Sequence, residues 1–266
     1  MLRSSDNAPP PVPTKALTVR AATGPSVRNR LLQRLPVREL DRLLARAERV
    51  PLSPRQILHH WNLPIREVYF VEQGLVSVSV KISRERAVEG WVIGSEGMSG
   101  IPVVFGHHET PPFRRVVQIG GCAWRVSAHD LADAVRELDT LGDLLQRYAS
   151  FVLCQTAQWG ACNAQHTAEE RTARWLLTAC EALESNRLPV THALLGCLLG
   201  ARRATVSVCL DHLQAENAIR NDRGLIEVVD RERLRSISCD CHSIVQRDYR
   251  HLFASPSLRV RAAALP

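Results

Sequence analysis

The order of hydrophobic and polar positions divides the chain into three stretches. From Arg28 to Arg49 leucines recur mostly at steps of three and four residues, which predicts a helix. Between Pro51 and Asp130 short alternating runs such as VYFV and LVSVSVKI are separated by glycines, which predicts an antiparallel sandwich or β-roll. Helical periodicity returns after Asp130. The pattern therefore predicts an α+β chain whose antiparallel roll is followed by helices.

The first long helical stretch after the roll carries a stripe with alternating steps of four and three residues. The members of this stripe are Leu141, Leu145, Tyr148, Val152, Gln155, Trp159 and Cys162. Such heptad spacing is typical of paired helices, and the polar Gln155 can fix the register between them. The alternative is a long helix that packs on the sheet of its own chain. We favour the paired helices, so the sequence predicts a homodimer.

The last stretch has the pattern of a winged helix-turn-helix. Thr191 is suited to cap a short helix that ends near Leu199, and Gly200 breaks that helix. A second helix is predicted over residues 202–216. Residues 219–229 then predict two strands joined by an Asp-Arg-Gly turn. Two short helices, a glycine turn and a small hairpin are the parts of a winged helix-turn-helix.

The second helix of this pair combines a core-facing stripe with a face suited to DNA. The stripe consists of Val206, Cys209, Leu210 and Leu213. On the other side, Arg203 is expected to pair with a guanine, and Ala204 and Val208 to contact thymine methyl groups. Phosphate contacts are expected from the remaining polar residues. The full predicted DNA-contacting set is Thr191, Arg202, Arg203, Ala204, Thr205, Ser207, Val208 and Arg223.

The charge of the chain agrees with a nucleic-acid partner. The 266 residues carry a formal net charge of +7, and the sequence pI is near 9.3. From Arg187 to Leu210 there are arginines but no carboxylate, and this local excess says more than the total. No run of eighteen apolar residues exists, so no membrane segment is predicted. We therefore expect a cytoplasmic protein that binds double-stranded DNA.

The eight cysteines have irregular spacing, and several lie inside apolar helical patterns. Such thiols behave as small buried hydrophobes, so we expect them to be reduced. The run Cys239-Asp240-Cys241-His242 offers two thiols and an imidazole, which suits part of a zinc site or a redox-labile pair. Cys154 and Cys162 are candidates for sensing oxidants. Ordinary helix packing is the favoured interpretation of all of these, and no metal site is predicted.

The order of roll, long helix and winged helix resembles the Crp/Fnr family of bacterial transcription regulators. The resemblance covers residues 28–250, and its most specific stretches are EVYFVEQGLVSV, SEGMSG, ACNAQHTAEERTARWLL, LLGARRATVSV and DRGLIEVVDRERL. It implies a homodimer that places one recognition helix per half-site of an inverted-repeat operator. It also implies RNA polymerase as a further partner if the chain activates transcription.

The resemblance gives Arg203 the family's principal guanine-reading position. The cyclic-AMP-responsive members follow this arginine with a glutamate and place a second arginine four residues later. Here those positions are Ala204 and Val208. The operator is therefore expected to differ from theirs, with apolar contacts at its outer bases.

The effector site implied by the family is altered in this chain. Its nucleotide pocket uses a Gly-Glu-Leu turn for the ribose and an arginine followed by a hydroxyl residue for the phosphate. The turn here is Gly100-Ile101-Pro102, and Val116 follows the candidate residues Arg114 and Arg115. A cyclic nucleotide is not expected, because its ribose hydroxyl would be left unpaired. Iron–sulfur binding is not expected either, because no cysteine precedes Cys122, and nothing marks an axial haem ligand.

Two other classes of function compete with DNA binding. A cupin-like enzyme would need an H-x-H metal pair, but His59-His60 and His107-His108 are adjacent, and adjacent strand residues point to opposite faces. No motif for a nucleophile or a phosphate loop is present, so no catalytic residue is predicted. A module that binds only proteins would not explain the Arg202-Arg203 pair.

The predicted organisation has five parts. These are a disordered tail at 1–27, a sensor-like roll at 28–134, a dimerisation helix at 135–166, a winged helix-turn-helix at 167–250 and a C-terminal tail at 251–266.

Overall fold

The computed structural model describes residues 27–84, 86–106 and 110–254. It begins with two short helices, η1 (Leu32–Arg34) and α1 (Val37–Leu44), in place of the single helix predicted to Arg49. Pro36 separates them with an extended backbone, at φ −55° and ψ 143°, and its ring cannot continue a helix. The chain is already in a strand at Ala47.

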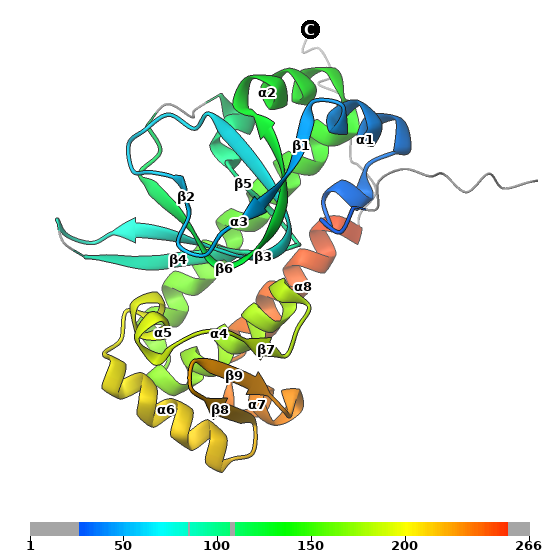
Figure 1. The fold of residues 1–266 in the computed structure, drawn as a ribbon. Helices are drawn as coiled ribbons and strands as arrows, with labels where there is room; N and C mark the ends of the chain where they lie inside the picture. Colours follow the sequence, from blue (N-terminus) through cyan, green and yellow to red (C-terminus); the bar gives the residue numbers. More distant parts are fainter. Residues whose placement is uncertain (1–26, 85, 107–109, 255–266) are drawn as a thin grey trace, which may run out of the picture.

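An antiparallel sheet forms the roll (Figure 1). Its strands are β1 (Ala47–Leu52), β2 (Ile57–His59), β3 (Glu67–Lys81), β4 (Ala87–Ile93), β5 (Met98–Ser99) and β6 (Phe113–Ser127). The two longest, β3 and β6, pair from Glu67 opposite Ser127 to Val80 opposite Phe113. The order is β1-β6-β3-β4, with β2 on β6 and β5 on β3. The predicted antiparallel roll is confirmed.

Two glycine sites that the sequence pattern assigned to turns lie instead inside the long strands. The register of β3 against β6 shifts around Gly74, which has a φ of +101°. A Cβ atom on Gly74 would lie 2.6 Å from the Ile119 carbonyl oxygen, and one on Gly121 would lie 2.1 Å from that of Gln73. These glycines therefore permit a bulge that bends both strands together, and the strands continue through it.

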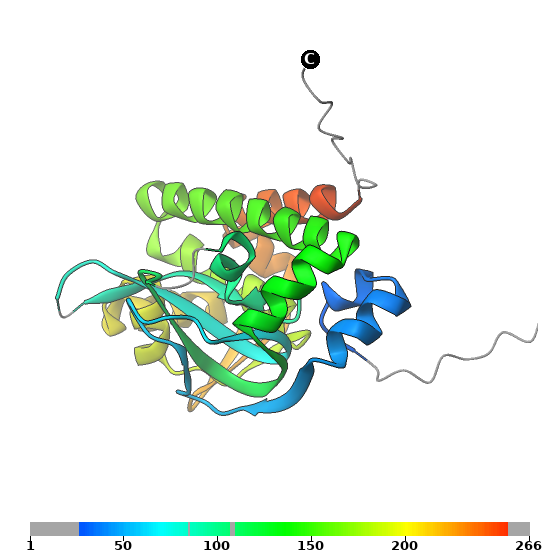
Figure 2. The ribbon, with the colours of Figure 1, turned by 90° about the horizontal axis from the view of Figure 1, so that it is seen from above.

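A layer of helices lies against the roll. The helix α2 (Ala128–Glu137) begins at Ser127, whose hydroxyl accepts a hydrogen bond from the Asp130 amide. The 27-residue α3 (Asp139–Gln165) follows, and Figure 2 shows α8 (Cys241–Ala254) running beside it. Phe151 and Tyr249 join these two helices through an edge-to-face contact with a centroid distance of 5.0 Å. A single hydrophobic core extends from the roll through α3 into the last domain.

The last domain starts at α4 (Ala168–Leu183), which has a complete capping box between Thr167 and Glu170. The elements that follow are β7 (Arg187–Leu188), α5 (His192–Leu199), α6 (Arg203–Ala215), β8 (Ile219–Asp222), β9 (Leu225–Val228) and α7 (Arg231–Ile237). No single helix in the described ranges is long and apolar enough to span a membrane. The helices α5 and α6 reach the required length and apolar composition only when they are taken together, and they are bent by 109° relative to each other.

The roll and the last domain share a buried polar contact at Glu89 of β4. Its side chain accepts a hydrogen bond of 2.8 Å from the Trp175 indole of α4, and the residue is 8% exposed. Burial raises the pKa of Glu89 to about 7 from an ordinary value of 4.5, although the hydrogen bond from Trp175 and the charge of Arg174 oppose the rise. The fold therefore favours the neutral acid at this position.

The wild type should lose stability as pH rises, because Glu89 then ionises while it is buried. The variant Glu89→Gln should not show this loss. Because the folded pKa lies above the unfolded one, the contribution of Glu89 is fully present below about pH 4.5 and is lost as pH rises to about 7. At about pH 8 the variant should be the more stable by up to about 3 kcal/mol, measured by urea unfolding across the pH range. Glu232→Gln, at an exposed carboxylate of α7, is the control for the same change of side chain. A stability difference for Glu89→Gln that stays constant between about pH 5 and pH 8 would contradict this assignment.

Candidate nucleic-acid interface

The helices α5 and α6 form a helix-turn-helix around Gly200. The axes bend by 109° between them, within the range of this motif. Gly200 ends α5 in the left-handed conformation, at φ +64°, and the Ala201 amide donates to the Gly196 carbonyl oxygen. Thr191 caps α5 by accepting from the Leu194 amide at 3.2 Å. The predicted cap and turn both occur.

The helix α6 has the two faces that its sequence predicts. The predicted core stripe of Val206, Cys209, Leu210 and Leu213 is buried. Arg202, Arg203, Ala204 and Thr205 are exposed, and Val208 is 69% exposed. Val208 lies one helical turn beyond the exposed Ala204, so the two side chains provide an apolar contact surface on the solvent-facing side of α6.

The two arginines at the start of α6 have no acidic partner among the described residues. Arg202 is the N-cap residue and Arg203 the first helical residue, and the first turn contains no acidic side chain. Neither guanidinium makes a hydrogen bond or ion pair with any residue that the structure describes. A helix N-terminus disfavours cations, so this arrangement is suited to an external anion.

A groove of ≈ 490 Å³ brings three of the predicted DNA contacts together. Thr191 from α5, Arg203 from α6 and Arg223 from the wing turn between β8 and β9 all line it. The predicted phosphate and base contacts thus come from three elements but converge on one concave surface. The charge of Arg203 and Arg223 suits a phosphate backbone that passes between α6 and the wing.

His192 holds the three sides of this groove together, a role that the sequence did not predict. Its Nδ1 atom lies 2.8 Å from the Ser207 hydroxyl on α6, and its Nε2 atom lies 2.9 Å from the Asn221 amide nitrogen on β8. Ser207 is half-buried and engaged with this imidazole. Ser207, one of the eight predicted DNA-contacting residues, is therefore hydrogen-bonded within the domain and helps to hold α5 against α6.

The structure contradicts the predicted dimer contact. All seven residues of the heptad stripe are at most 8% exposed within the chain itself, namely Leu141, Leu145, Tyr148, Val152, Gln155, Trp159 and Cys162. The stripe packs against β4 of the roll and against α8, and Trp159 stacks on Arg174 of α4. The Tyr148 hydroxyl donates to the Met98 carbonyl oxygen at 3.4 Å. The heptad spacing reflects burial against the protein's own body, which is the alternative interpretation of the sequence.

The opposite face of α3 is the one that is open to solvent. Its members are mostly small, namely Gln146, Ser150, Leu153, Ala157, Gly160, Ala161 and Ala164. Leu153 is 71% exposed, more than any other large apolar side chain that the structure describes. A Cβ atom on Gly160 would have no neighbour within 4 Å. This face leaves space for a closely packed helix.

The two candidate effector residues lie on opposite faces of β6. Arg114 stacks on the Trp61 ring at 4.3 Å, whereas Arg115 is 1% exposed. Arg115 borders a cavity of ≈ 430 Å³ whose other walls are largely apolar and include Ile101, Trp91 and Leu153. Its Nε and Nη1 atoms have no hydrogen-bond partner among the described residues, and burial lowers its pKa to about 10. Only Arg115 therefore faces a possible ligand.

The histidines considered for a cupin-like metal site do not form one in the described residues. His59 is buried, with one ring nitrogen 2.7 Å from the Glu67 carbonyl oxygen and the other 3.2 Å from the Ser99 hydroxyl. Burial lowers the pKa of His59 to about 3. His107, His108 and Glu109 lie outside the described residues. His242 lies 3.2 Å from Glu181 and not with the two cysteines that precede it.

Comparison with known proteins supports both the domain and the fold. Residues 170–237 match the family model described as a Crp-like helix-turn-helix domain. The fold is similar to that of FixK2 from Bradyrhizobium japonicum, with a TM-score of 0.63 and 19% identity over 73% of this chain and 98% of that one. No curated protein matches the sequence.

Two further solved structures have the same fold. The c-di-GMP-responsive regulator CLP of Xanthomonas campestris has a TM-score of 0.57 and 20% identity over 73% of this chain and 99% of that one. A CRP-family transcriptional regulator from Thermus thermophilus has a TM-score of 0.58 and 15% identity over 71% of this chain and 96% of that one. The resemblance to Crp/Fnr regulators and the predicted fold class are confirmed.

Proposed function

We propose that this chain, whose Crp-like helix-turn-helix domain is joined to the fold of the Crp/Fnr regulators, is a sequence-specific DNA-binding transcription regulator. The observation that carries the proposal is the pair Arg202-Arg203, which projects without partners from the N-terminus of α6 beside a groove that reaches the wing. DNA binding explains this pair, and a catalytic role would not. The proposal places the protein in the cytoplasm, where bacterial DNA lies.

The proposed contacts divide into base reading and backbone binding. Arg203 pairs with a guanine in the major groove, and the exposed Ala204 and Val208 contact thymine methyl groups. Phosphates are contacted by Arg202 and Thr205 at the start of α6, and by Thr191 and Arg223 across the groove. Ser207 supports this surface through His192 and is not a base contact in this proposal.

We further propose a homodimer on an inverted-repeat operator, paired through the solvent-facing side of α3. The exposed Leu153 and the small residues around it allow the α3 helices of two copies to approach closely. A dimer with a two-fold axis presents two α6 helices to successive turns of a major groove. RNA polymerase is a further partner if the regulator activates transcription.

The roll is proposed to contain an altered effector site. Ile101 stands where the family has the ribose-binding carboxylate, and it lines the cavity at Arg115. The cavity is largely apolar, and its wall holds the buried guanidinium of Arg115 and the buried Glu89, whose neutral form the fold favours. This lining fits an amphipathic anion better than a cyclic nucleotide.

We expect Arg203→Ala to weaken binding to the operator by about 1–3 kcal/mol and to relax sequence preference at one base position per half-site. Arg223→Ala should instead weaken binding almost equally for all sequences and reduce its salt dependence, because it removes phosphate contacts. Arg38→Ala, an exposed arginine on α1, provides a control with the same change of charge. Fluorescence anisotropy across a salt series measures all three. Unchanged affinity and sequence preference for Arg203→Ala would contradict the assignment of the recognition helix.

Leu153→Glu should raise the dissociation constant of the dimer at least about tenfold, because it would bury a carboxylate between the two α3 helices. Val37→Glu, at a 60% exposed apolar residue of α1, is the matched control and should leave association unchanged. Sedimentation equilibrium measures both. A Leu153→Glu variant that associates as tightly as the wild type would show that this face of α3 is not the dimer contact.

The cavity should bind octanoate through its carboxylate and exclude cyclic AMP. Octanoate is therefore expected to raise the melting temperature of the wild type but not that of Arg115→Met, which keeps an unbranched flexible stem and removes the guanidinium. Arg114→Met, on the outer face of β6, should respond as the wild type does. A saturable shift with cyclic AMP would contradict the proposed alteration of the site.

A further inference from the structure

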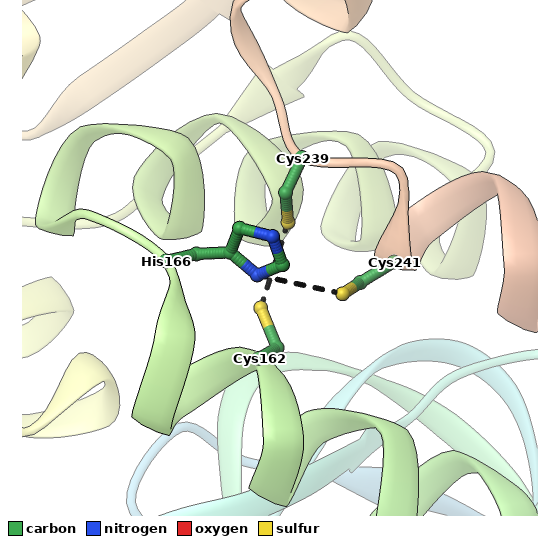
Figure 3. A group of neighbouring side chains, drawn as sticks. All are labelled: Cys162, His166, Cys239 and Cys241. Atoms are coloured by element: carbon green, nitrogen blue, oxygen red, sulfur yellow. Dashed lines mark hydrogen bonds between the residues drawn. The ribbon is translucent and has the colours of Figure 1, made fainter.

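Three cysteines and one histidine converge where the end of α3 meets the connection between α7 and α8 (Figure 3). The donor atoms of Cys162, His166, Cys239 and Cys241 all lie within 4.8 Å of one another. The Cys162 and Cys239 sulfurs are 3.5 Å apart, and the Cys241 sulfur lies 3.7 Å from the His166 Nδ1 atom. Two distant segments of the chain thus direct all four donor atoms at one point.

The local structure explains why the four side chains meet. Cys162 and His166 are four residues apart at the C-terminal end of α3, so they lie on the same side of it. Cys239 and Cys241 flank Asp240 at the start of α8, which packs along α3. The three cysteines are at most 7% exposed, and they form a small cluster separate from the main hydrophobic core. The histidine is half-buried and closes the cluster toward solvent.

We propose that Cys162, His166, Cys239 and Cys241 bind one zinc ion. Three sulfurs and one imidazole nitrogen form one of the ligand sets of structural zinc sites. Zinc–sulfur bonds of about 2.3 Å in a tetrahedron place neighbouring sulfurs about 3.8 Å apart, close to the separations in this cluster. The small spread of the donor atoms leaves room for a single ion and not for a polynuclear cluster.

Two polar side chains next to the cluster are suited to support bound thiolates. The Gln158 amide donates to the Cys241 sulfur at 3.1 Å, as a supporting residue around a metal site does. Arg174 is 3% exposed and stacks on Trp159 at 4.7 Å, and its Nε and Nη1 atoms have no hydrogen-bond partner among the described residues. Zinc with three thiolates and a neutral imidazole carries a net charge of −1. A buried guanidinium beside such a site compensates that charge.

Four protein ligands complete the tetrahedron and leave no open position, so the role of the site is structural. It connects the end of α3 to the segment that leads into α8. In the sequence, the first of these segments precedes the helix-turn-helix and the second follows it. The ion would therefore fix the last domain to the long helix. This inference does not depend on the proposed DNA binding.

The first experiment measures metal in the full-length chain, purified with reduced thiols, by mass spectrometry after equilibration with Zn²⁺ and gel filtration. The wild type should hold one zinc per chain, and Co²⁺ in its place should give the absorption of a tetrahedral thiolate site. Cys162→Ser and Cys239→Ser should each bind at least about tenfold more weakly. Cys154→Ser is the matched control, since Cys154 is exposed on the same helix outside the cluster. Less than about a tenth of an ion in the wild type, or equal binding by Cys239→Ser, would overturn the proposal.

A second measurement on the wild type alone covers the case in which a variant fails to fold. Alkylation with peptide mapping should find Cys162, Cys239 and Cys241 protected in the zinc-loaded chain and reactive after chelation. The exposed Cys154 and Cys197 should react equally in both states. Restored protection and a restored melting temperature on adding zinc back would support the site. Identical alkylation of the three cysteines with and without zinc would overturn it.

Discussion

One apolar side of α3 is buried along most of the helix, and both the roll and the last domain pack against it. Along its 27 residues this helix meets the roll, then α8, and finally the cluster of cysteines beside α7 and α8. Tyr148 occupies space that only a glycine at position 97 leaves free, since a Cβ atom there would lie 2.1 Å from its hydroxyl oxygen. Phe151 packs on Tyr249, and Trp159 stacks on Arg174. Each domain is held in place by a different section of the same helix.

Direct contacts of β4 and the turn after it with the last domain link the roll to the DNA-facing surface. Glu89 of β4 accepts a hydrogen bond from Trp175 of α4, and the Ser95 amide donates to the Ala182 carbonyl oxygen. A Cβ atom on Gly200, in the turn between α5 and α6, would lie 3.3 Å from the Val88 side chain. A change in the roll that moves β4 would therefore act directly on α4 and on the turn that precedes α6. The cavity at Arg115 is also bordered by β4 and α3. A ligand bound in this cavity would therefore contact β4 and would be placed to cause such a movement.

The sequence predicted those features that depend on local spacing. The stripe of α6, the Thr191 cap and the Gly200 turn follow from patterns within a few residues, and the structure has all three. The heptad stripe of α3 identified a buried face but not what buries it, because a heptad pattern has the same spacing in either case. Gly74 and Gly121 resembled turn residues, since a bulge and a turn both need a residue without a Cβ atom.

Features formed by residues that are far apart in the sequence could not be predicted from the sequence pattern. Cys239 and Cys241 stood out, but the histidine next to them in sequence, His242, points to Glu181. The histidine that joins them is His166, which the chain brings from the end of α3. The spacing of Cys162 and His166 by four residues was the one signal that would have suggested a second half of the site. His192 was missed for a similar reason, because its partners lie on two later elements.

A selection of bound fragments from a genomic DNA library, followed by sequencing, tests whether this chain recognises a DNA sequence. The full-length chain would be used with reduced thiols and zinc, and without added effector. A homodimeric regulator should enrich an inverted repeat whose half-site centres lie about one helical turn apart. The same selection with Arg203→Ala should recover repeats with relaxed preference at one position of each half-site. Fragments that share no sequence, recovered no more often than random genomic DNA, would contradict the account of this chain as a sequence-specific regulator.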